Sequence, residues 1–374
     1  MADGVKKGFS GIGGQAVLEG VMMKNGEKYA VAVRKPDGNL TVEVEHYSGI
    51  LHGNGINKIP FVRGIFNFVD SLILGMRALN YSSSFYDNES EKEARRDSKT
   101  LKNDSKSGGA SVMIIIISFI LAIGLFVVLP TYLSSLFEKF IRNDSLIAII
   151  EGAIRILIFL GYIILISCLK DIRRLYAYHG AEHKCINCIE RGRILTVKNV
   201  LRSSRFHKRC GTSFLYLVVI ISVILFIFIR VDTIWLRLVI RIAMIPVIAG
   251  ISYEILRLAG RFDNAFISII SAPGLWIQHL TTKEPDKYMV QVAIASVEAV
   301  FDWKAYLKEN YDYEVTDDML AEDDDEDHIK IHYKDESEEI IALKNPDNII
   351  LEEDDWEDGP ELEEPDEDDW EDET

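Results

Sequence analysis

The feature that most constrains this chain is a run of eighteen residues, 112–129, without one charged side chain. The hydrocarbon core of a bilayer is about 30 Å thick, so a helix needs roughly 20 mainly apolar residues to cross it. Three further stretches are long and apolar enough, which excludes an ordinary soluble globule. We therefore expect a mainly α membrane protein with four transmembrane helices, at 111–137, 146–169, 213–229 and 234–258.

Two of these stretches carry charged residues one helical turn apart, Glu151 with Arg155 and Arg237 with Arg241. A charge inside a membrane helix either pairs with a partner in the bundle or extends to the interface. Glu151 and Arg155 have the spacing to neutralise each other. Such residues allow a transporter as one function, although the four stretches show no internal repeat.

Lys and Arg side chains gather between the second and third stretches. Segment 170–211 carries eleven of them, whereas the connections near 138–145 and 230–233 are short and carry few. The positive-inside rule therefore predicts a multi-pass protein of the cell membrane with both termini in the cytoplasm. The four cysteines then lie in a reducing compartment, where they are free to bind metal.

The remaining residues divide by composition. Residues 29–34 and 40–44 alternate around a Pro-Asp-Gly turn, which predicts a hairpin, and 61–80 have helical apolar spacing. Residues 265–280 are interrupted by Pro273 and Gly274, so we expect an interfacial or re-entrant element with Trp276 at headgroup level. The expected divisions are a small cytoplasmic α+β module (1–85), a polar linker (86–110), helices 1 and 2 (111–169), a cytoplasmic loop (170–211), helices 3 and 4 (212–259), a juxtamembrane and helical segment (260–313) and a tail (314–374).

The net charge of −17 is the sum of two regions with net charges of opposite sign. Residues 314–374 hold 30 Asp and Glu against 3 Lys, while the other 313 residues hold 38 Lys and Arg against 28 Asp and Glu. So dense an acidic run cannot collapse into a core, and we expect a disordered tail. It either keeps the protein soluble or binds a basic protein partner. The bilayer is the other expected partner, and no nucleic-acid partner is expected.

Segment 170–211 also contains the residues best suited to chemistry. His179, Glu182 and His183 stand at positions i, i+3 and i+4, which share one face of a helix. Two imidazoles one turn apart can hold a divalent metal, and the carboxylate beside them can activate a bound water. Zinc needs a third protein ligand, for which His207, Cys210, Cys188 and Glu190 are near enough in sequence.

Two other interpretations compete with a catalytic centre. Cys185-x-x-Cys188 and His207-x-x-Cys210 have the spacing of a closed, structural zinc knuckle. Alternatively, the segment holds no metal and is a basic juxtamembrane loop near anionic lipid.

Several blocks of the sequence resemble the YqhQ-like bacterial membrane family, a group of unknown function labelled as metal-dependent enzymes. The blocks are GGQAVLEGVMM (13–23), HGAEHK (179–184), HKRCGTSF (207–214), GISYE (250–254) and PGLWIQ (273–278) with LTTKEP (280–285). The resemblance covers about residues 10–300 and implies a metal site at His179, Glu182 and His183. Cys185 stands where the family usually has Thr, which counts against a knuckle built on it.

The resemblance also draws attention to Gln15, Glu19, Glu254 and Gln278. Glu254 could be a further ligand or base, or it could pair with Arg257 or Arg261. We expect a metal-dependent enzyme, with hydrolysis of a peptide or a lipid-linked substrate as the candidate reaction and Glu182 as the base. The metal is a divalent ion, with zinc favoured, and its candidate ligands are His179, His183, His207, Cys210, Cys188 and Glu254. A membrane scaffold with a structural zinc site and a transporter are the alternatives, and the substrate and oligomeric state stay open.

Overall fold

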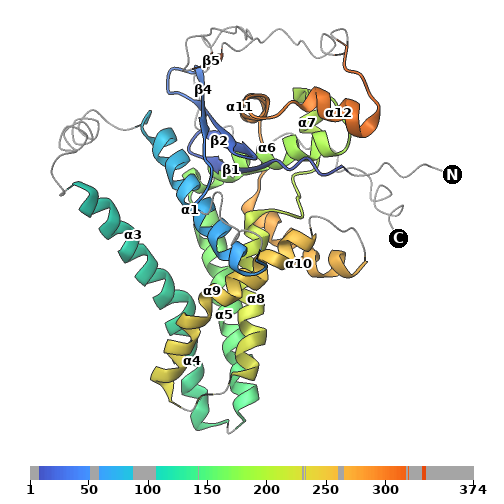
Figure 1. Ribbon diagram of the computed structural model, residues 1–374. Coiled ribbons are helices and arrows are strands. Elements are labelled where there is room, and N and C mark those ends of the chain that lie inside the picture. The colour runs from blue at the N-terminus through green and yellow to red at the C-terminus, as the bar shows by residue number, and fades with distance from the viewer. Residues whose placement is uncertain are drawn as a thin grey trace.

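The computed structural model describes residues 8–50, 59–86, 107–141, 143–229, 231, 233–259, 265–316, 319 and 331–333. These residues form an α+β body on top of a bundle of long helices (Figure 1). The predictions for most of the linker at 86–110 and of the acidic tail fall on residues outside the described ranges.

The sheet of the body is an antiparallel meander of four strands. They are β1 (Gly13–Val17), β2 (Gly20–Asn25), β3 (Lys28–Arg34) and β4 (Leu40–His46), and a short β5 (Ile331–Tyr333) pairs in parallel with β4. The hairpin predicted around the Pro-Asp-Gly turn is confirmed as β3 and β4. The first hairpin was not predicted. It closes through Leu18 and Glu19, and Glu19 takes the positive φ of 51° that such a tight turn requires.

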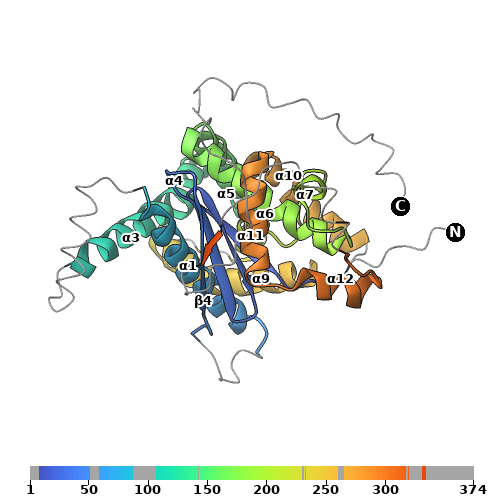
Figure 2. The same ribbon diagram turned by 90° about the horizontal axis from the view of Figure 1, so that it is seen from above.

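Helices cover both faces of this sheet (Figure 2). Side chains alternate along β3, so Tyr29, Val31 and Val33 pack with α1 (Val62–Ser83). Ala30 and Ala32 of the same strand face α6 (Lys170–Glu190) and α11 (Lys287–Glu298). Because both faces are buried, β3 is apolar almost throughout.

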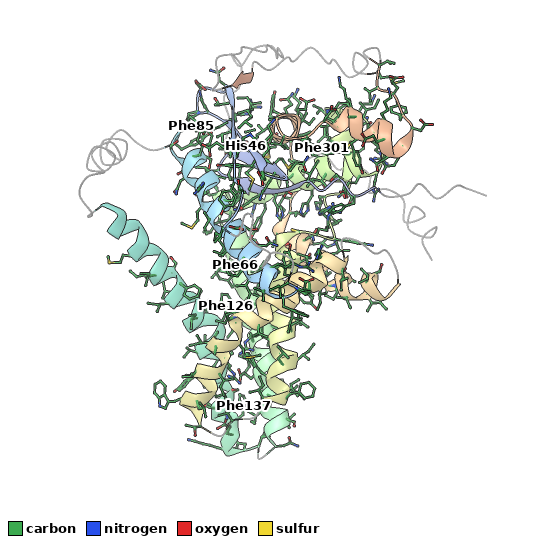
Figure 3. All side chains as sticks on the ribbon, in the orientation of Figure 1. His46, Phe66, Phe85, Phe126, Phe137 and Phe301 are labelled. Atoms are coloured by element: carbon green, nitrogen blue, oxygen red, sulfur yellow. The ribbon has the colours of Figure 1, made fainter. Side chains whose placement is uncertain are left out.

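The body is assembled from three distant parts of the chain. Residues 8–86 supply the sheet and α1, while α6 and α7 (Val197–Leu201) come from between two spans. The third part is α11 with α12 (Trp303–Tyr311), and side chains from all three fill one core (Figure 3). The segment at 170–211, which connects two spans, is largely helical, and its apolar face covers the sheet.

The described residues contain four helices long and apolar enough to cross a membrane, at Ile116–Lys139, Ser145–Ser167, Gly211–Phe228 and Trp235–Ala259. They belong to α3 (Ser107–Ile123) with its continuation α4 (Leu129–Ser135), α5 (Asp144–Ser167), α8 (Gly211–Phe228) and α9 (Ile234–Ala259). The predicted membrane fold is therefore confirmed. A further helix, α10 (Ala265–Thr281), runs unbroken through Pro273 and lies across the junction of bundle and body (Figure 1).

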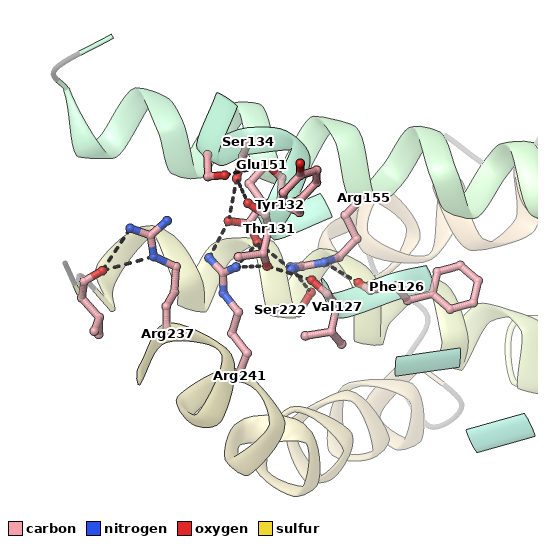
Figure 4. A network of polar contacts seen from close by, with 12 residues as sticks. Phe126, Val127, Thr131, Tyr132, Ser134, Glu151, Arg155, Ser222, Arg237 and Arg241 are labelled. Atoms are coloured by element: carbon pink, nitrogen blue, oxygen red, sulfur yellow. Dashed lines mark hydrogen bonds and ion pairs between the residues drawn. The ribbon is translucent and has the colours of Figure 1, made fainter. Parts of the chain in front are cut away.

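The charged residues of the spans meet inside the bundle (Figure 4). Arg155 donates to Glu151 at 2.8 Å, and Arg241 from α9 binds the same carboxylate. Thr131 and Ser134 of α4 lie within hydrogen-bonding distance of Glu151 as well. The pairing expected for Glu151 and Arg155 is present, and this cluster joins three helices without needing a transported substrate to explain its charges.

Candidate metal centre

The motif residues His179, Glu182 and His183 lie on the face of α6 that turns toward the bundle end of the body. Gly180 does not interrupt this helix. A Cβ atom at Gly180 would lie 2.0 Å from the carbonyl oxygen of Lys283, so the glycine allows the segment after α10 to cross α6 at that point. The backbone N–H of Lys283 accordingly donates to the carbonyl of Tyr176 at 2.9 Å.

Cys210 completes a group of three metal-binding side chains. It is the N-cap residue of α8, and its Sγ accepts a hydrogen bond from the backbone N–H of Thr212 at 3.4 Å. Sγ lies 3.2 Å from Nε2 of His179, and one ligand atom each from His179, His183 and Cys210 lies within 4.8 Å of the others. Ligand atoms bound tetrahedrally to zinc stand about 3.5 Å apart, so a small inward adjustment would suffice.

Backbone carbonyls orient both imidazole rings. Nδ1 of His179 lies 2.8 Å from the carbonyl oxygen of Thr281, and Nδ1 of His183 lies 2.6 Å from that of Arg205. A carbonyl oxygen only accepts, so both Nδ1 atoms carry hydrogens. Nε2 is therefore the ring atom of each histidine that is left to bind a metal, and an Nδ1 atom held by a carbonyl is typical of metal-binding histidines.

Glu182 adds a buried carboxylate beside the three ligand atoms. Its Oε2 lies 3.9 Å from Nε2 of His179 and 4.0 Å from Nε2 of His183. Burial raises the pKa of Glu182, although the two histidines and the backbone N–H of Gly14 oppose that rise. A Cβ at Gly14 would lie 2.8 Å from Cγ of Glu182, so β1 can approach α6 this closely only with glycine there.

The histidines of the cluster favour the metal-binding form of Cys210. Burial opposes ionisation of Cys210, but His179 and His183 outweigh it and hold the thiol pKa well below its ordinary value. Burial likewise opposes charge on His179, but the neighbouring Cys210 raises its pKa to about 9. These shifts favour a thiolate beside an imidazolium in the metal-free cluster. The thiolate is the form of cysteine that binds zinc, whereas His179 must give up its Nε2 proton to bind the ion.

His207 lies next to this group and is paired elsewhere. Its ring centre is 5.6 Å from that of His183, but its Nε2 lies 3.7 Å from Oε2 of Glu190, which also binds Arg209. Burial, with the charge of Arg209, lowers the pKa of His207 and keeps it neutral. The side chain of Gln278, itself fully buried, binds both the backbone N–H and the carbonyl of His207 at 2.8 Å.

The other predicted ligands lie outside the group of three. Cys185 and Cys188 are buried in the hydrophobic core between α6, the sheet and α11. Burial raises the pKa of Cys185 well above its ordinary value, as for an inert thiol. Glu254 forms an ion pair with Arg63 of α1, with Nε to Oε1 at 2.6 Å, and lies 4.0 Å from Arg257.

Sequence reasoning missed the residues that position the ligands. Gly14, Thr281 and Arg205 act through backbone atoms, so their side-chain identities carry no ligand signal. Gln278 was noticed in the family blocks, but its contact with His207 was not foreseen. Glu19, noticed in the same way, pairs with Arg174 and accepts a hydrogen bond from Tyr178.

A helical membrane-type bundle with an α+β body, holding buried His, His and Cys ligand atoms beside a glutamate, defines a membrane protein with a candidate metal centre. The chain belongs to the family described as protein of unknown function (DUF1385), whose model matches residues 59–303. It is 35% identical over 303 residues to the uncharacterized protein YqhQ of Bacillus subtilis (strain 168), covering 80% of this chain and 94% of that protein. No solved structure matches the chain. The family resemblance noted in the sequence is confirmed.

Proposed function

We propose that this protein is a metal-dependent hydrolase of the cell membrane, with a divalent ion, zinc by preference, held by His179, His183 and Cys210. The observation that carries the proposal is the convergence of the Nε2 atoms of two histidines and the Sγ of Cys210, with both Nδ1 atoms bound to carbonyls. This set fits zinc, which takes nitrogen and sulfur ligands and keeps a fourth position open in catalytic sites.

Glu182 is the proposed general base. When bound, the metal ion would lower the pKa of a water molecule at the open position toward neutrality. Oε2 of Glu182, about equally far from both Nε2 atoms, is placed to accept the proton of that water. The raised pKa of Glu182 makes it a better proton acceptor than an ordinary carboxylate. The same carboxylate could instead be a fourth ligand, which would make the site closed and structural.

We place the body and both termini in the cytoplasm. Support comes from the eleven Lys and Arg of segment 170–211, which the fold assigns to the body side of the spans. Cys210 directly precedes the span Gly211–Phe228, so the centre lies near the membrane surface. A substrate that is a peptide or a lipid-linked molecule held at that surface would reach it.

The test is the metal content of the detergent-purified protein by mass spectrometry. We expect about one zinc per chain in the wild type and in Cys185→Ala, whose thiol lies in the core. His183→Ala and Cys210→Ala should each lose it. Loss of metal in Cys185→Ala and Cys210→Ala with retention in His183→Ala would favour the zinc knuckle. A wild type that takes up no zinc, manganese or iron would refute the metal centre.

The variant Glu182→Gln separates an enzyme from a scaffold. If Glu182 is the base, the Glu182→Gln protein should keep its zinc and lose the in vivo function. Retained function with retained zinc would favour a scaffold with a structural ion. Weakened zinc binding would show that Glu182 is a ligand.

One observation favours a second candidate, a cysteine nucleophile. The Sγ of Cys210 at the start of α8 and Nε2 of His179 at 3.2 Å form the pair that a thiol hydrolase needs. In that mechanism the thiolate attacks a carbonyl carbon and His179 gives its proton to the leaving group. Full activity of metal-free protein, abolished by alkylation of Cys210, would establish this candidate and exclude the first.

A further inference from the structure

Helix α10 has an exposed stripe that no described element covers. Ile269 is 72% exposed and Trp276 is 59% exposed, and Ala272 and His279 are exposed on the same face. The opposite face is buried, with Ile277 at 2% and Gln278 at 0%. An amphipathic helix with a tryptophan on its open side is typical of an element lying in a membrane interface.

The location of α10 agrees with such a role. The helix packs against α8 and α5 and lies across the end of the bundle where the spans meet the body (Figure 1). Its stripe ends at His279, and Lys283 follows one turn further along the chain. The open face thus continues from apolar side chains into basic ones at the end of the spans.

A group of cations gathers where this stripe ends. The backbone N–H of Lys283 donates to the carbonyl of Tyr176, which lies one turn after Arg173 on α6. Lys283 is therefore held close to Arg173. Arg205 is close enough to Lys283 for its charge to act on it. The ring of Phe206 packs on that of His279, with 4.3 Å between the centroids. Arg173 itself stands six residues beyond the span Ser145–Ser167, close to the headgroup layer.

The nearby acids balance only part of this group of cations. Glu284 is the carboxylate that faces the group, and it is shared between Arg205 and Lys184. Among the described residues, no carboxylate pairs with Arg173 or Lys283. Burial and the charges of Arg205 and Arg173 lower the pKa of Lys283, so the group repels its own members and would gain by binding an anion.

We propose that α10 lies in the headgroup layer with its stripe toward the lipid, and that Arg173, Lys283 and His279 bind the phosphate of an anionic membrane lipid. Charge complementarity and continuity with the spanning helices both favour a lipid as the occupant. The proposal goes beyond the metal centre and does not depend on it.

The test counts lipids bound to the full chain in neutral detergent by native mass spectrometry. Short-chain phosphatidylglycerol and phosphatidylcholine are titrated in parallel. Because each Lys or Arg at a membrane surface attracts anionic lipid by about fivefold, Arg173→Ala/Lys283→Ala should weaken phosphatidylglycerol binding about thirtyfold. The matched control Lys304→Ala/Lys308→Ala removes the same charge from α12 and should bind as the wild type does.

A charge-preserving variant, Arg173→Lys/Lys283→Arg, should restore binding, and it serves as the test if the alanine variant does not fold. Three results would each overturn the proposal: no preference of the wild type for phosphatidylglycerol, equal losses in the two alanine variants, or loss of binding in the charge-preserving variant. The proposal would also be overturned if inorganic phosphate displaced bound phosphatidylglycerol from the wild type as readily as added lipid does. The site would then be one for free phosphate. Zinc content, measured on the same samples, separates these results from failure of the metal centre.

Discussion

Gly180→Ala is the sharpest test of how α6 and α10 hold the centre. The added Cβ would lie 2.0 Å from the carbonyl oxygen of Lys283, whereas carbon and oxygen normally come no closer than about 3.3 Å. The segment after α10 must therefore retreat by more than about 1 Å. That movement carries away the carbonyl of Thr281, which now lies 2.8 Å from Nδ1 of His179.

The size of the effect follows from two opposing terms. Overpacking costs about 1–3 kcal/mol, and alanine in place of glycine returns about 1 kcal/mol of helix propensity. The net loss of about 0–2 kcal/mol should lower Tm by a few degrees. Loss of the carbonyl that orients a metal-binding histidine typically weakens metal affinity about 10–100-fold, which we expect here for zinc.

The assay is competition for zinc against a chromophoric chelator, together with thermal unfolding in detergent. The matched control is Gly161→Ala in α5, where a Cβ would meet nothing within 4 Å. It should leave zinc affinity unchanged and keep or raise Tm. If Gly180→Ala bound zinc as tightly as the wild type, the close crossing would not position His179, and the reasoning would be refuted.

Three further predictions concern other parts of the molecule. Glu190 has a pKa of about 2, because His207 and Arg209 overcome the effect of its burial, and its ordinary value is 4.5. The ionised Glu190 contributes about 3 kcal/mol to the free energy of unfolding; this contribution is complete above pH 4.5 and is lost as the pH falls toward 2. Over that pH range, acid should therefore lower the Tm of the wild type more than the Tm of Glu190→Gln. Glu151→Gln should lower the free energy of unfolding by about 3–5 kcal/mol, because it leaves two buried guanidinium groups without their carboxylate. Glu138→Gln, at a partly exposed pair, should cost at most about 1 kcal/mol, and equal costs would contradict the buried cluster. Iodoacetamide at neutral pH should alkylate Cys210 of metal-free protein in preference to Cys185, which is also buried but has a raised pKa, as peptide mass spectrometry would show. Zinc should suppress that reaction, and indifference to zinc would contradict ligation by Cys210.

Local patterns were sufficient for the helices and for one hairpin. The four apolar stretches exceed the length that a bilayer requires, and their observed bounds lie within a few residues of the expected ones. The Pro-Asp-Gly turn and the alternation beside it located β3 and β4. The β1–β2 hairpin was not predicted because its turn, Leu18 and Glu19, contains none of the residues that usually indicate a hairpin turn.

The spacing of His179, Glu182 and His183 predicted a shared helix face, and the structure puts them on one. No spacing rule could choose Cys210 over Cys188, because both are near in sequence to the motif. The choice depends on where α8 begins and on the core that encloses Cys188. The ligand roles themselves stay predictions until metal is measured.

The sequence by itself determined that the chain spans a membrane and which face of α6 carries the motif, because hydrophobic length and helical period are local properties. Only the tertiary structure decided that Gly14, Thr281 and Arg205 surround that face, since they act through backbone atoms brought from three distant segments. It also decided that Arg63, from a distant helix, is the nearer partner of Glu254, beside the expected Arg257 at 4.0 Å. Contacts of this kind depend on how helices cross, and the crossing is fixed by the packing of whole surfaces rather than by any one residue.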